Sequence, residues 1–275
     1  MKQEHPNHSL GVVITGGSKG LGYALAAEFL AAGDRVVICG RDAQRLAESL
    51  QALQRAVPDG EISGIKCDIG DPSAAKVLAD FAVAKLGKVD RWINNAGTAG
   101  MLKRPLWELD ADDMLETCTT NLAGTLMLCA EAVKVMRRQP SFAKPCYHIF
   151  NMGFSLLGAS FSRSAVPHKS SKRGVAEVTH FLARELNAAG ITSIGVHELS
   201  PGLVLTDLLL RDASEEAGRF LRVIAEKPEK VAAILVPKIR SITARNSRLR
   251  YESLAKMVFR IVIALPRLFG KAEPF

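Results

Sequence analysis

Residues 15–22 read Thr15-Gly16-Gly17-Ser18-Lys19-Gly20-Leu21-Gly22, between the apolar run Leu10–Ile14 and a segment of helical period, Leu21–Ala32. Glycines in such a turn let the backbone bend tightly and approach a ligand, and they allow a helix to pack closely on a strand. The free amides of the first helical turn bind an anion such as a pyrophosphate. The stretch therefore predicts a dinucleotide-binding turn. The residues expected to contact the cofactor are Gly16, Ser18, Lys19, Gly20, Leu21 and Gly22.

Apolar runs of strand length alternate with segments of helical period along most of the chain. This alternation is typical of β-α-β units, which wind into a parallel sheet. The chain has 275 residues, of which 48% are hydrophobic, so it can bury one sizeable core. We predict an α/β fold of the Rossmann type, a single domain with a doubly wound parallel sheet over residues 1–242. A C-terminal extension with a basic amphipathic helix is expected over residues 243–275.

Six strands and six helical segments are expected. The strands are Leu10–Ile14, Arg35–Cys39, Ile62–Cys67, Val89–Ile93, Tyr147–Asn151 and Ser193–Glu198. The helices are Leu21–Ala32, Ala43–Ala56, Ser73–Leu86, Asp112–Arg138, His168–Ala189 and a segment from Thr206 onward. The glycines expected to cap helices at their C-termini are Gly33, Gly87 and Gly190. Because open α/β sheets bind ligands at the carboxyl ends of their strands, the motifs at these ends are expected to converge.

The composition narrows the function classes. The five cysteines form no C-x-x-C pair and the six histidines are scattered, so we expect no metal site and a reducing compartment. That compartment is the cytoplasm, or the plastid stroma if the source is a phototrophic eukaryote. The net charge of +8 arises mostly from residues 238–275, which contain nine Lys/Arg and two Glu. No basic stripe with interleaved aromatics accompanies this charge, so nucleic-acid binding is not expected.

The end of the second strand bears on the choice of cofactor. An acidic residue there binds the ribose hydroxyls of NAD and repels the 2′-phosphate of NADP. This chain has Cys39-Gly40-Arg41 instead, and Arg41 together with Lys19 offers two cations to a phosphate. We therefore predict NADPH, although both charges also fit plain solvated positions. Asp68 and Ile69 follow the third strand, where they fit either a contact with the adenine ring or a cap for the next helix.

Five motifs in order along the chain indicate a family resemblance. They are the glycine turn at 15–22, Asn94-Asn95-Ala96-Gly97, Asn121, Lys172 and Pro201-Gly202-x-x-x-Thr206. With them the chain resembles the short-chain dehydrogenase/reductase family from Leu10 to about Leu210. The resemblance implies hydride transfer between a nicotinamide and a carbonyl carbon, and a homo-oligomer, dimeric or tetrameric. It also implies that Lys172 binds the nicotinamide ribose and that Asn121 belongs to the catalytic set. The further cofactor contacts that it implies are Asn95, Ala96, Gly97, Pro201, Gly202 and Thr206.

The general acid of that family is a tyrosine four residues before the lysine, and this chain has His168 there. Ser155 is the hydroxyl nearest to the place of the family's catalytic serine. An imidazolium can donate a proton, and a pKa of about 6.5 leaves it partly protonated near neutrality, but the charges of Lys169 and Lys172 oppose protonation. Three interpretations stay open: a substitute acid, a relic in a protein that binds NADPH without catalysis, and a structural histidine beside a substrate that supplies the proton.

Further stretches resemble chlorophyll(ide) b reductases. They are residues 148–152, 171–173, 196–202, 207–209, 225–231 and 235–240. Those enzymes use NADPH to reduce a formyl group on a chlorin ring to hydroxymethyl, and they retain the tyrosine. The resemblance implies an NADPH-dependent carbonyl reductase whose substrate is a formyl-chlorin or another bulky hydrophobic aldehyde or ketone. A non-catalytic NADPH-binding regulator or scaffold is the alternative.

The last segment of the chain has one apolar helical face. It consists of Leu254, Met257, Val258, Ile261, Val262 and Leu265. A proline, Pro266, is expected to end the helix. A basic amphipathic helix of this kind fits peripheral contact of residues 250–270 with an anionic membrane surface, and it is too short to span a bilayer. A helix that closes over the substrate crevice or packs at a dimer interface fits the same pattern.

Overall fold

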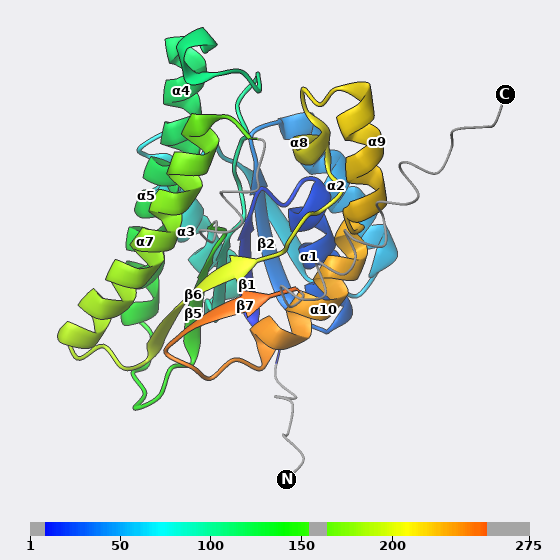
Figure 1. The fold of residues 1–275 in the computed structure, drawn as a ribbon. Helices are drawn as coiled ribbons and strands as arrows, with labels where there is room; N and C mark the ends of the chain where they lie inside the picture. Colours follow the sequence, from blue (N-terminus) through cyan, green and yellow to red (C-terminus); the bar gives the residue numbers. More distant parts are fainter. Residues whose placement is uncertain (1–8, 154–163, 252–275) are drawn as a thin grey trace, which may run out of the picture.

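The computed structural model describes residues 9–153 and 164–251, which form an α/β fold around one parallel sheet (Figure 1). The seven strands of this sheet lie in the order β3-β2-β1-β4-β5-β6-β7, and every neighbouring pair is parallel. The strands are β1 Gly11–Thr15, β2 Arg35–Gly40, β3 Ile62–Lys66, β4 Arg91–Asn94, β5 Tyr147–Asn151, β6 Ile194–Ser200 and β7 Asn246–Arg250. The predicted Rossmann-type sheet is confirmed.

The strands at the centre of the sheet differ from the last one in burial. β1, β4 and β5 are buried over their full length, as strands covered on both faces should be. The seventh strand corrects the prediction of six. Its sequence Asn-Ser-Arg-Leu-Arg alternates between exposed and half-buried residues, and it lies at the edge of the sheet beside β6. Because β7 falls within the segment predicted as an extension, the sheet continues beyond residue 242.

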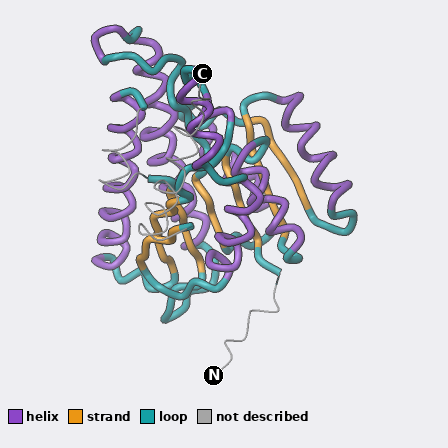
Figure 2. The backbone as a smooth tube through the Cα atoms, turned by 45° about the vertical axis from the view of Figure 1, so that its right-hand side comes forward, coloured by secondary structure: helices purple, strands orange, loops and turns teal. Residues whose placement is uncertain are grey.

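Helices cover both faces of the sheet (Figures 1 and 2). The helices are α1 Gly20–Ala31, α2 Ala43–Ala56, α3 Ala74–Leu86, α4 Ala111–Cys118, α5 Gly124–Arg137, α7 Val166–Ala188, α8 Asp207–Leu210, α9 Glu215–Ile224 and α10 Pro228–Arg240. The short turns are the 3-10 turn η1 Leu106–Glu108 and the π-helical turn η2 Thr119–Ala123. One apolar core lies between the sheet and α1, α2 and α10, and the other between the sheet and α3, α5 and α7. This is the doubly wound arrangement.

Two of the expected helices are divided in the structure. The segment Asp112–Arg138 forms α4, η2 and α5 in succession. The segment from Thr206 onward forms α8, α9 and α10, because Thr206 and Ser214 each accept a hydrogen bond from a backbone amide three residues later and so begin a new helix. The predicted capping glycines have positive φ angles, as C-cap glycines do. These angles are 81° at Gly33, 67° at Gly87 and 67° at Gly190.

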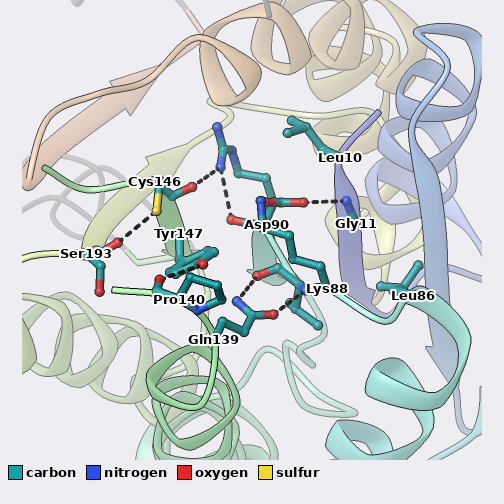
Figure 3. A network of polar contacts seen from close by, with 12 residues as sticks. Leu10, Gly11, Leu86, Lys88, Asp90, Gln139, Pro140, Cys146, Tyr147 and Ser193 are labelled. Carbon is teal, nitrogen blue, oxygen red and sulfur yellow. Dashed lines mark hydrogen bonds and ion pairs between the residues drawn. The ribbon is translucent and has the colours of Figure 1, made fainter. Parts of the chain in front are cut away.

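A polar network at the amino-terminal end of the sheet joins strands that are far apart in the sequence (Figure 3). Asp90 accepts a hydrogen bond from the amide of Gly11 at 2.9 Å and forms an ion pair with Lys88 at 2.6 Å. The side chain of Gln139 bonds both the amide and the carbonyl of Val89. These bonds hold the amino-terminal ends of the strands in place. The carboxyl ends, where open α/β sheets bind their ligands, lie at the opposite edge of the sheet.

Arg91 is a buried cation near this network. Its guanidinium donates hydrogen bonds to the carbonyl oxygens of Ile239 and Arg240 at the end of α10, both at 2.9 Å. It also donates to the carbonyl of Cys146 at the start of β5. Burial lowers the pKa of Arg91 to about 10, which leaves it charged at neutral pH. A cation at a helix C-terminus stabilises the unpaired carbonyls there, so Arg91 attaches α10 to the sheet.

The described part of the chain contains no helix that is both long and apolar enough to cross a bilayer. The predicted apolar face of residues 254–265 lies outside the described residues. Its contact with a membrane, with the crevice or with a second subunit therefore stays a prediction.

Candidate active site

The glycine turn after β1 leaves little room for side chains. Gly16 has a φ of +65°, and a Cβ added there would lie 2.9 Å from the Cα of Ala96. A Cβ at Gly22 would collide with the carbonyl oxygen of Gly16. Gly20, at the first position of α1, also has a positive φ, and Leu21 turns its side chain into the core. The bare backbone and the first amides of α1 fit the pyrophosphate of a dinucleotide.

Thr15 and Asn95 join the glycine turn to the Asn-Asn-Ala-Gly segment. The hydroxyl of Thr15 accepts hydrogen bonds from the amides of Asn95 at 3.1 Å and Ala96 at 3.0 Å. The side-chain amide of Asn95 donates to the carbonyls of Thr15 at 2.9 Å and Gly16 at 3.3 Å. The two predicted cofactor segments therefore lie side by side at the carboxyl ends of β1 and β4.

Gly40 and Ser18 bring the end of β2 against the same turn. A Cβ added at Gly40 would lie 2.8 Å from the hydroxyl oxygen of Ser18. The hydroxyl of Ser49 on α2 donates to the carbonyl of Ser18 at 2.7 Å and so fixes the turn from the other side. The absence of a side chain at Gly40 thus allows the end of β2 to lie close against the glycine turn.

Both of the predicted phosphate-binding cations form ion pairs. Arg41 contacts Glu116 of α4 at 2.7 Å, with about half of each side chain exposed. Lys19 contacts Asp207 at the start of α8 at 3.2 Å. Ion pairs this exposed contribute about 0–1 kcal/mol. An anion of higher charge can therefore replace either carboxylate at low cost.

Asp68 and Ile69 lie at the end of β3, where an adenine ring was expected. The carboxylate of Asp68 accepts from the amide of Gly70 at 3.0 Å and stays exposed. It does not cap α3, whose N-cap is Ser73. Ile69 is buried, and a Cβ at Gly124 would lie 2.6 Å from its carbonyl oxygen. Of the two interpretations of Asp68, the helix cap is wrong and the adenine contact stays a prediction.

Asn121 lies in the π-helical turn between α4 and α5 and is fully buried. Its carbonyl oxygen accepts from the amide of Thr98, and its amide nitrogen donates to the carbonyl of Thr98, both at 2.9 Å. The same nitrogen donates to the hydroxyl of Ser171 at 3.0 Å. π-turns of this kind are frequent at functional sites. Asn121 therefore connects the loop after β4 to α7 next to the predicted catalytic lysine.

Lys172 is a buried cation in the first half of α7. A Cβ added at Gly97 would lie 3.0 Å from Lys172 Nζ and 2.9 Å from Asn121 Oδ1, so the lysine and the asparagine meet at this glycine. Lys172 is only 7% exposed, and burial lowers its pKa to about 8. Its ammonium group can therefore exchange a proton near neutral pH, which is the property that acid–base catalysis requires.

His168 lies four residues before Lys172 on the same helix and is 5% exposed. Burial, together with the charges of Lys172 and Lys103, lowers the pKa of His168 to about 4. The imidazole is therefore neutral at pH 7, and the expectation that it is partly protonated near neutrality is wrong. The second opposing charge is also corrected, from Lys169 to Lys103.

The segment after β6 returns to the glycine turn. Gly202 has a φ of +75°, which turns the chain after Pro201. Thr206 caps α8, and its methyl group would lie 3.1 Å from a Cβ added at Gly20. The two motifs at either end of the predicted family region are thus neighbours in space. Ser155 lies outside the described residues.

Several residues that shape the site were not anticipated from the sequence. They are Thr98, Lys103, Glu116, Ser171 and Asp207. Ser171 adjoins Lys172 in the predicted motif, so a search for hydroxyls beside the lysine would have found it. Asp207 likewise adjoins Thr206 of the predicted motif. Thr98, Lys103 and Glu116 reach the site through contacts between segments that are distant in the sequence.

Comparisons with known proteins agree with this arrangement. Residues 11–217 match the short chain dehydrogenase family. The chain is 41% identical over 238 residues to chlorophyll(ide) b reductase NOL, chloroplastic, of Oryza sativa subsp. japonica, an alignment that covers 86% of this chain and 68% of that protein.

Solved structures share the fold. One is 3-oxoacyl-[acyl-carrier protein] reductase from Brucella melitensis in complex with NAD, with a TM-score of 0.75, 21% identity and coverage of 89% of this chain and 96% of that one. Another is a metagenomic short-chain oxidoreductase in complex with NADP, with a TM-score of 0.66, 22% identity and coverage of 88% and 96%. At such identities these structures support the fold alone.

The glycine turn, the Asn-Asn-Ala-Gly segment and the buried Asn121 and Lys172 lie close together at the carboxyl ends of the strands, and the family match spans all of them. Such an arrangement holds a nicotinamide cofactor beside a carbonyl or hydroxyl group. The chain belongs to the short-chain dehydrogenase family and is an oxidoreductase that acts on carbonyl or hydroxyl groups.

Proposed function

We propose that this chain is an NADPH-dependent reductase of a bulky hydrophobic aldehyde, with a formyl-chlorin as the first substrate to test. The observation on which the proposal depends is Lys172, a buried ammonium with a pKa of about 8 that meets Asn121 at the bare backbone of Gly97. A group with this pKa can hold a proton near neutral pH and release it to a developing alkoxide. The 41% identity to a chlorophyll(ide) b reductase supports the choice of substrate.

The choice of NADPH over NADH follows from charge. Gly40 presents no acid to the 2′ position, and it packs against Ser18, so that the cations that follow each of them in the sequence, Arg41 and Lys19, are the ones offered to a phosphate there. The 2′-phosphate would displace Glu116 from Arg41, because a dianion attracts a guanidinium more strongly than a half-exposed carboxylate does. A ribose hydroxyl has no charge with which to do so.

Bound NADPH supplies the hydride that reduces the carbonyl carbon. His168 is neutral at pH 7, so it acts as an N–H hydrogen-bond donor that orients the carbonyl oxygen. Lys172 supplies the proton, and the segment His168-x-x-x-Lys172 divides between two residues the work that a tyrosine does in the family. Asn121 fixes the backbone of Thr98 beside them and, as a positioning residue, keeps the geometry of the pair.

The test is NADPH oxidation with a formyl-chlorin, followed by identification of the hydroxymethyl product. We expect turnover in the wild type, a loss of about 10²-fold or more in kcat for Lys172→Met, and little change for Lys169→Met, which removes the same charge three residues away. Turnover by Lys172→Met at the wild-type rate would overturn the role of Lys172. Turnover of other bulky ketones and aldehydes but not of the chlorin would keep the reductase and change its substrate.

A second candidate function is non-catalytic NADPH binding in a regulator or scaffold. The neutral, buried His168 favours it, because an imidazole with a pKa of about 4 is a weak source of protons at pH 7. In that case NADPH binds to the protein, and no aldehyde in a substrate panel causes NADPH oxidation.

The name of the rice relative includes a chloroplast location. We therefore propose the plastid stroma as the location of this protein if its source has plastids, and the cytoplasm otherwise.

A further inference from the structure

The loop after β4, residues 98–103, is held by several hydrogen bonds, and its last residue, Lys103, acts electrostatically on His168. Its first residue, Thr98, is bonded through its backbone to Asn121, and the hydroxyl of Thr98 accepts from the amide of Gly100 at 3.2 Å. The amide of Met101 donates to the carboxylate of Asp113 on α4 at 2.8 Å. One of these bonds lies within the loop and the others come from α4 and the π-helical turn that follows it, so tertiary contacts help to determine the position of the loop.

The far end of this loop is joined to the segment around the end of α8. The backbone amide of Lys103 donates to the carboxylate of Asp212 at 2.6 Å, and Lys103 Nζ donates to the carbonyl of Leu209 at 3.2 Å. In return the guanidinium of Arg211 donates to the carbonyl of Gly100 at 3.2 Å. α4 and α8 lie at the same end of the molecule (Figure 1). The two segments therefore lie side by side and form one wall of the candidate site.

The charge of Lys103 acts on His168. The lysine side chain is half-buried, and its ammonium is close enough to His168 to contribute to the lowered pKa of the imidazole. The hydrogen bond described for Nζ is to an uncharged carbonyl, whereas an ammonium has three donors. Donors on Lys103 are therefore available for an anion.

Residues 98–103 and 209–212, which form this wall, contain two cations, Lys103 and Arg211, and one carboxylate, Asp212, so the wall has a net charge of +1. Lys172 lies four residues after His168 on α7. The carboxylate of Asp212 accepts from the amide of Lys103, and its charge also acts on the Lys103 ammonium, whose pKa it raises while burial lowers it. Asp113 accepts from the amide of Met101, and Asp207 forms an ion pair with Lys19. A substrate with a negative group would neutralise the surplus.

We propose that Lys103 is a specificity-determining residue that binds a carboxylate of the substrate, so that a hydrophobic aldehyde with a free acid group is preferred to its ester. The proposal rests on the reductase function proposed above. The adjoining residues Met101 and Leu102, which are 62% and 39% exposed, offer apolar contact to the body of the same molecule. The substrate class is thus an amphiphile: a large apolar ring system with one acid within reach of Lys103.

The experiment compares a formyl-chlorin free acid with its methyl ester in kcat/KM. We expect the wild type to prefer the acid about fivefold or more, as for a partly exposed charge pair. Lys103→Gln should abolish this preference by lowering kcat/KM for the acid to that for the ester, while Lys103→Arg should retain it. Arg104→Gln is the matched control, since it removes a positive charge from the exposed neighbouring position. Equal losses for acid and ester in Lys103→Gln, or an equal effect of Arg104→Gln, would overturn the proposal.

A binding measurement separates this proposal from the reductase function. The affinities of the same two chlorins are measured by their own fluorescence polarisation, with NADP⁺ present so that no turnover is needed. If the wild type binds the acid about fivefold more tightly and Lys103→Gln binds both equally, Lys103 is confirmed even where neither compound is reduced. If the wild type binds both equally, the role of Lys103 is refuted even where both are reduced.

Discussion

A pair of histidines buried between β5 and β6 should make this protein sensitive to acid. His148 Nδ1 and His197 Nε2 are 2.9 Å apart, and neither side chain has any exposed surface. Gly195 makes room for them, because a Cβ there would lie 2.7 Å from one ring and 2.8 Å from the other. Burial and the charge of Arg91 lower the pKa of His148 to about 2 and that of His197 to about 4. Both rings are therefore neutral in the folded protein at pH 5.

The size of the effect follows from these values. In the unfolded chain each histidine titrates near pH 6.5, so below that pH the unfolded state binds protons that the folded state does not. The free energy of unfolding then falls by about 1.4 kcal/mol per pH unit for each histidine. At pH 5 the loss is about 2 kcal/mol for each ring and about 4 kcal/mol for the pair, compared with a total of about 5–15 kcal/mol for a domain. His168 adds a loss of the same sign, and the raised pKa of the buried Asp34 opposes it.

Urea unfolding between pH 7 and pH 5 measures this loss, with tryptophan fluorescence as the signal because Trp92 is fully buried. His148→Gln preserves a hydrogen-bonding group next to His197 but cannot gain a charge, so its stability should fall by about 2 kcal/mol less than that of the wild type over this range. His180→Gln, at an exposed position of α7, is the matched control. Parallel curves for the wild type and His148→Gln would refute the reasoning, since they would mean that His148 titrates alike in both states.

Further predictions concern the cofactor and the catalytic pair. Arg41→Ala should weaken NADPH by about tenfold or more and NADH by less than about twofold, as measured by equilibrium binding, because only NADPH carries the 2′-phosphate; equal losses would show that Arg41 does not contact this group. Glu116→Gln should tighten NADPH by up to about fivefold without changing NADH, since it removes the carboxylate that competes for Arg41; weaker binding would instead make Glu116 a residue that positions Arg41. The kcat of carbonyl reduction should fall as the pH rises through about 8, where Lys172 loses its proton. A kcat that instead increases tenfold for each unit by which the pH is lowered below 7 would assign the proton to His168.

The parts of the fold that could be predicted are those whose burial demands a continuous pattern. β1 and β5 are buried throughout, so most of their residues are apolar, and the glycines of residues 15–22 are required by close backbone contacts. β7 could not be found this way, because an edge strand that alternates between exposed and half-buried residues can be as polar as Asn-Ser-Arg-Leu-Arg. The π-turn at Asn121 escaped for a different reason, since a change of helical period over five residues leaves no trace in the hydrophobic pattern.

The residues of the candidate site also differ in whether the sequence alone could predict them. Asn95 and Lys172 belong to local motifs and were predictable by resemblance, whereas Glu116 and Lys103 act on Arg41 and His168 across segments that lie far apart in the sequence. Their effect is electrostatic, and a charge several residues outside any motif reveals its partner only when the chain is folded. The pKa of His168 is the clearest case. The direction of its shift could be foreseen from the neighbouring lysines, but the burial that causes most of it could not.

The exchange of tyrosine for histidine changes what the neighbouring lysine does. A cation beside a tyrosine stabilises the phenolate and so makes the phenol a better acid, while the same cation beside a histidine opposes the imidazolium and removes its acidic form. Burial acts on the two basic side chains in one direction, and it leaves His168 neutral but Lys172 still able to hold a proton near pH 8. In the proposed mechanism the acid of the site therefore moves along α7 from position 168 to position 172. The structure accommodates this proposal because Lys172 is buried and its ammonium meets Asn121 at the bare backbone of Gly97.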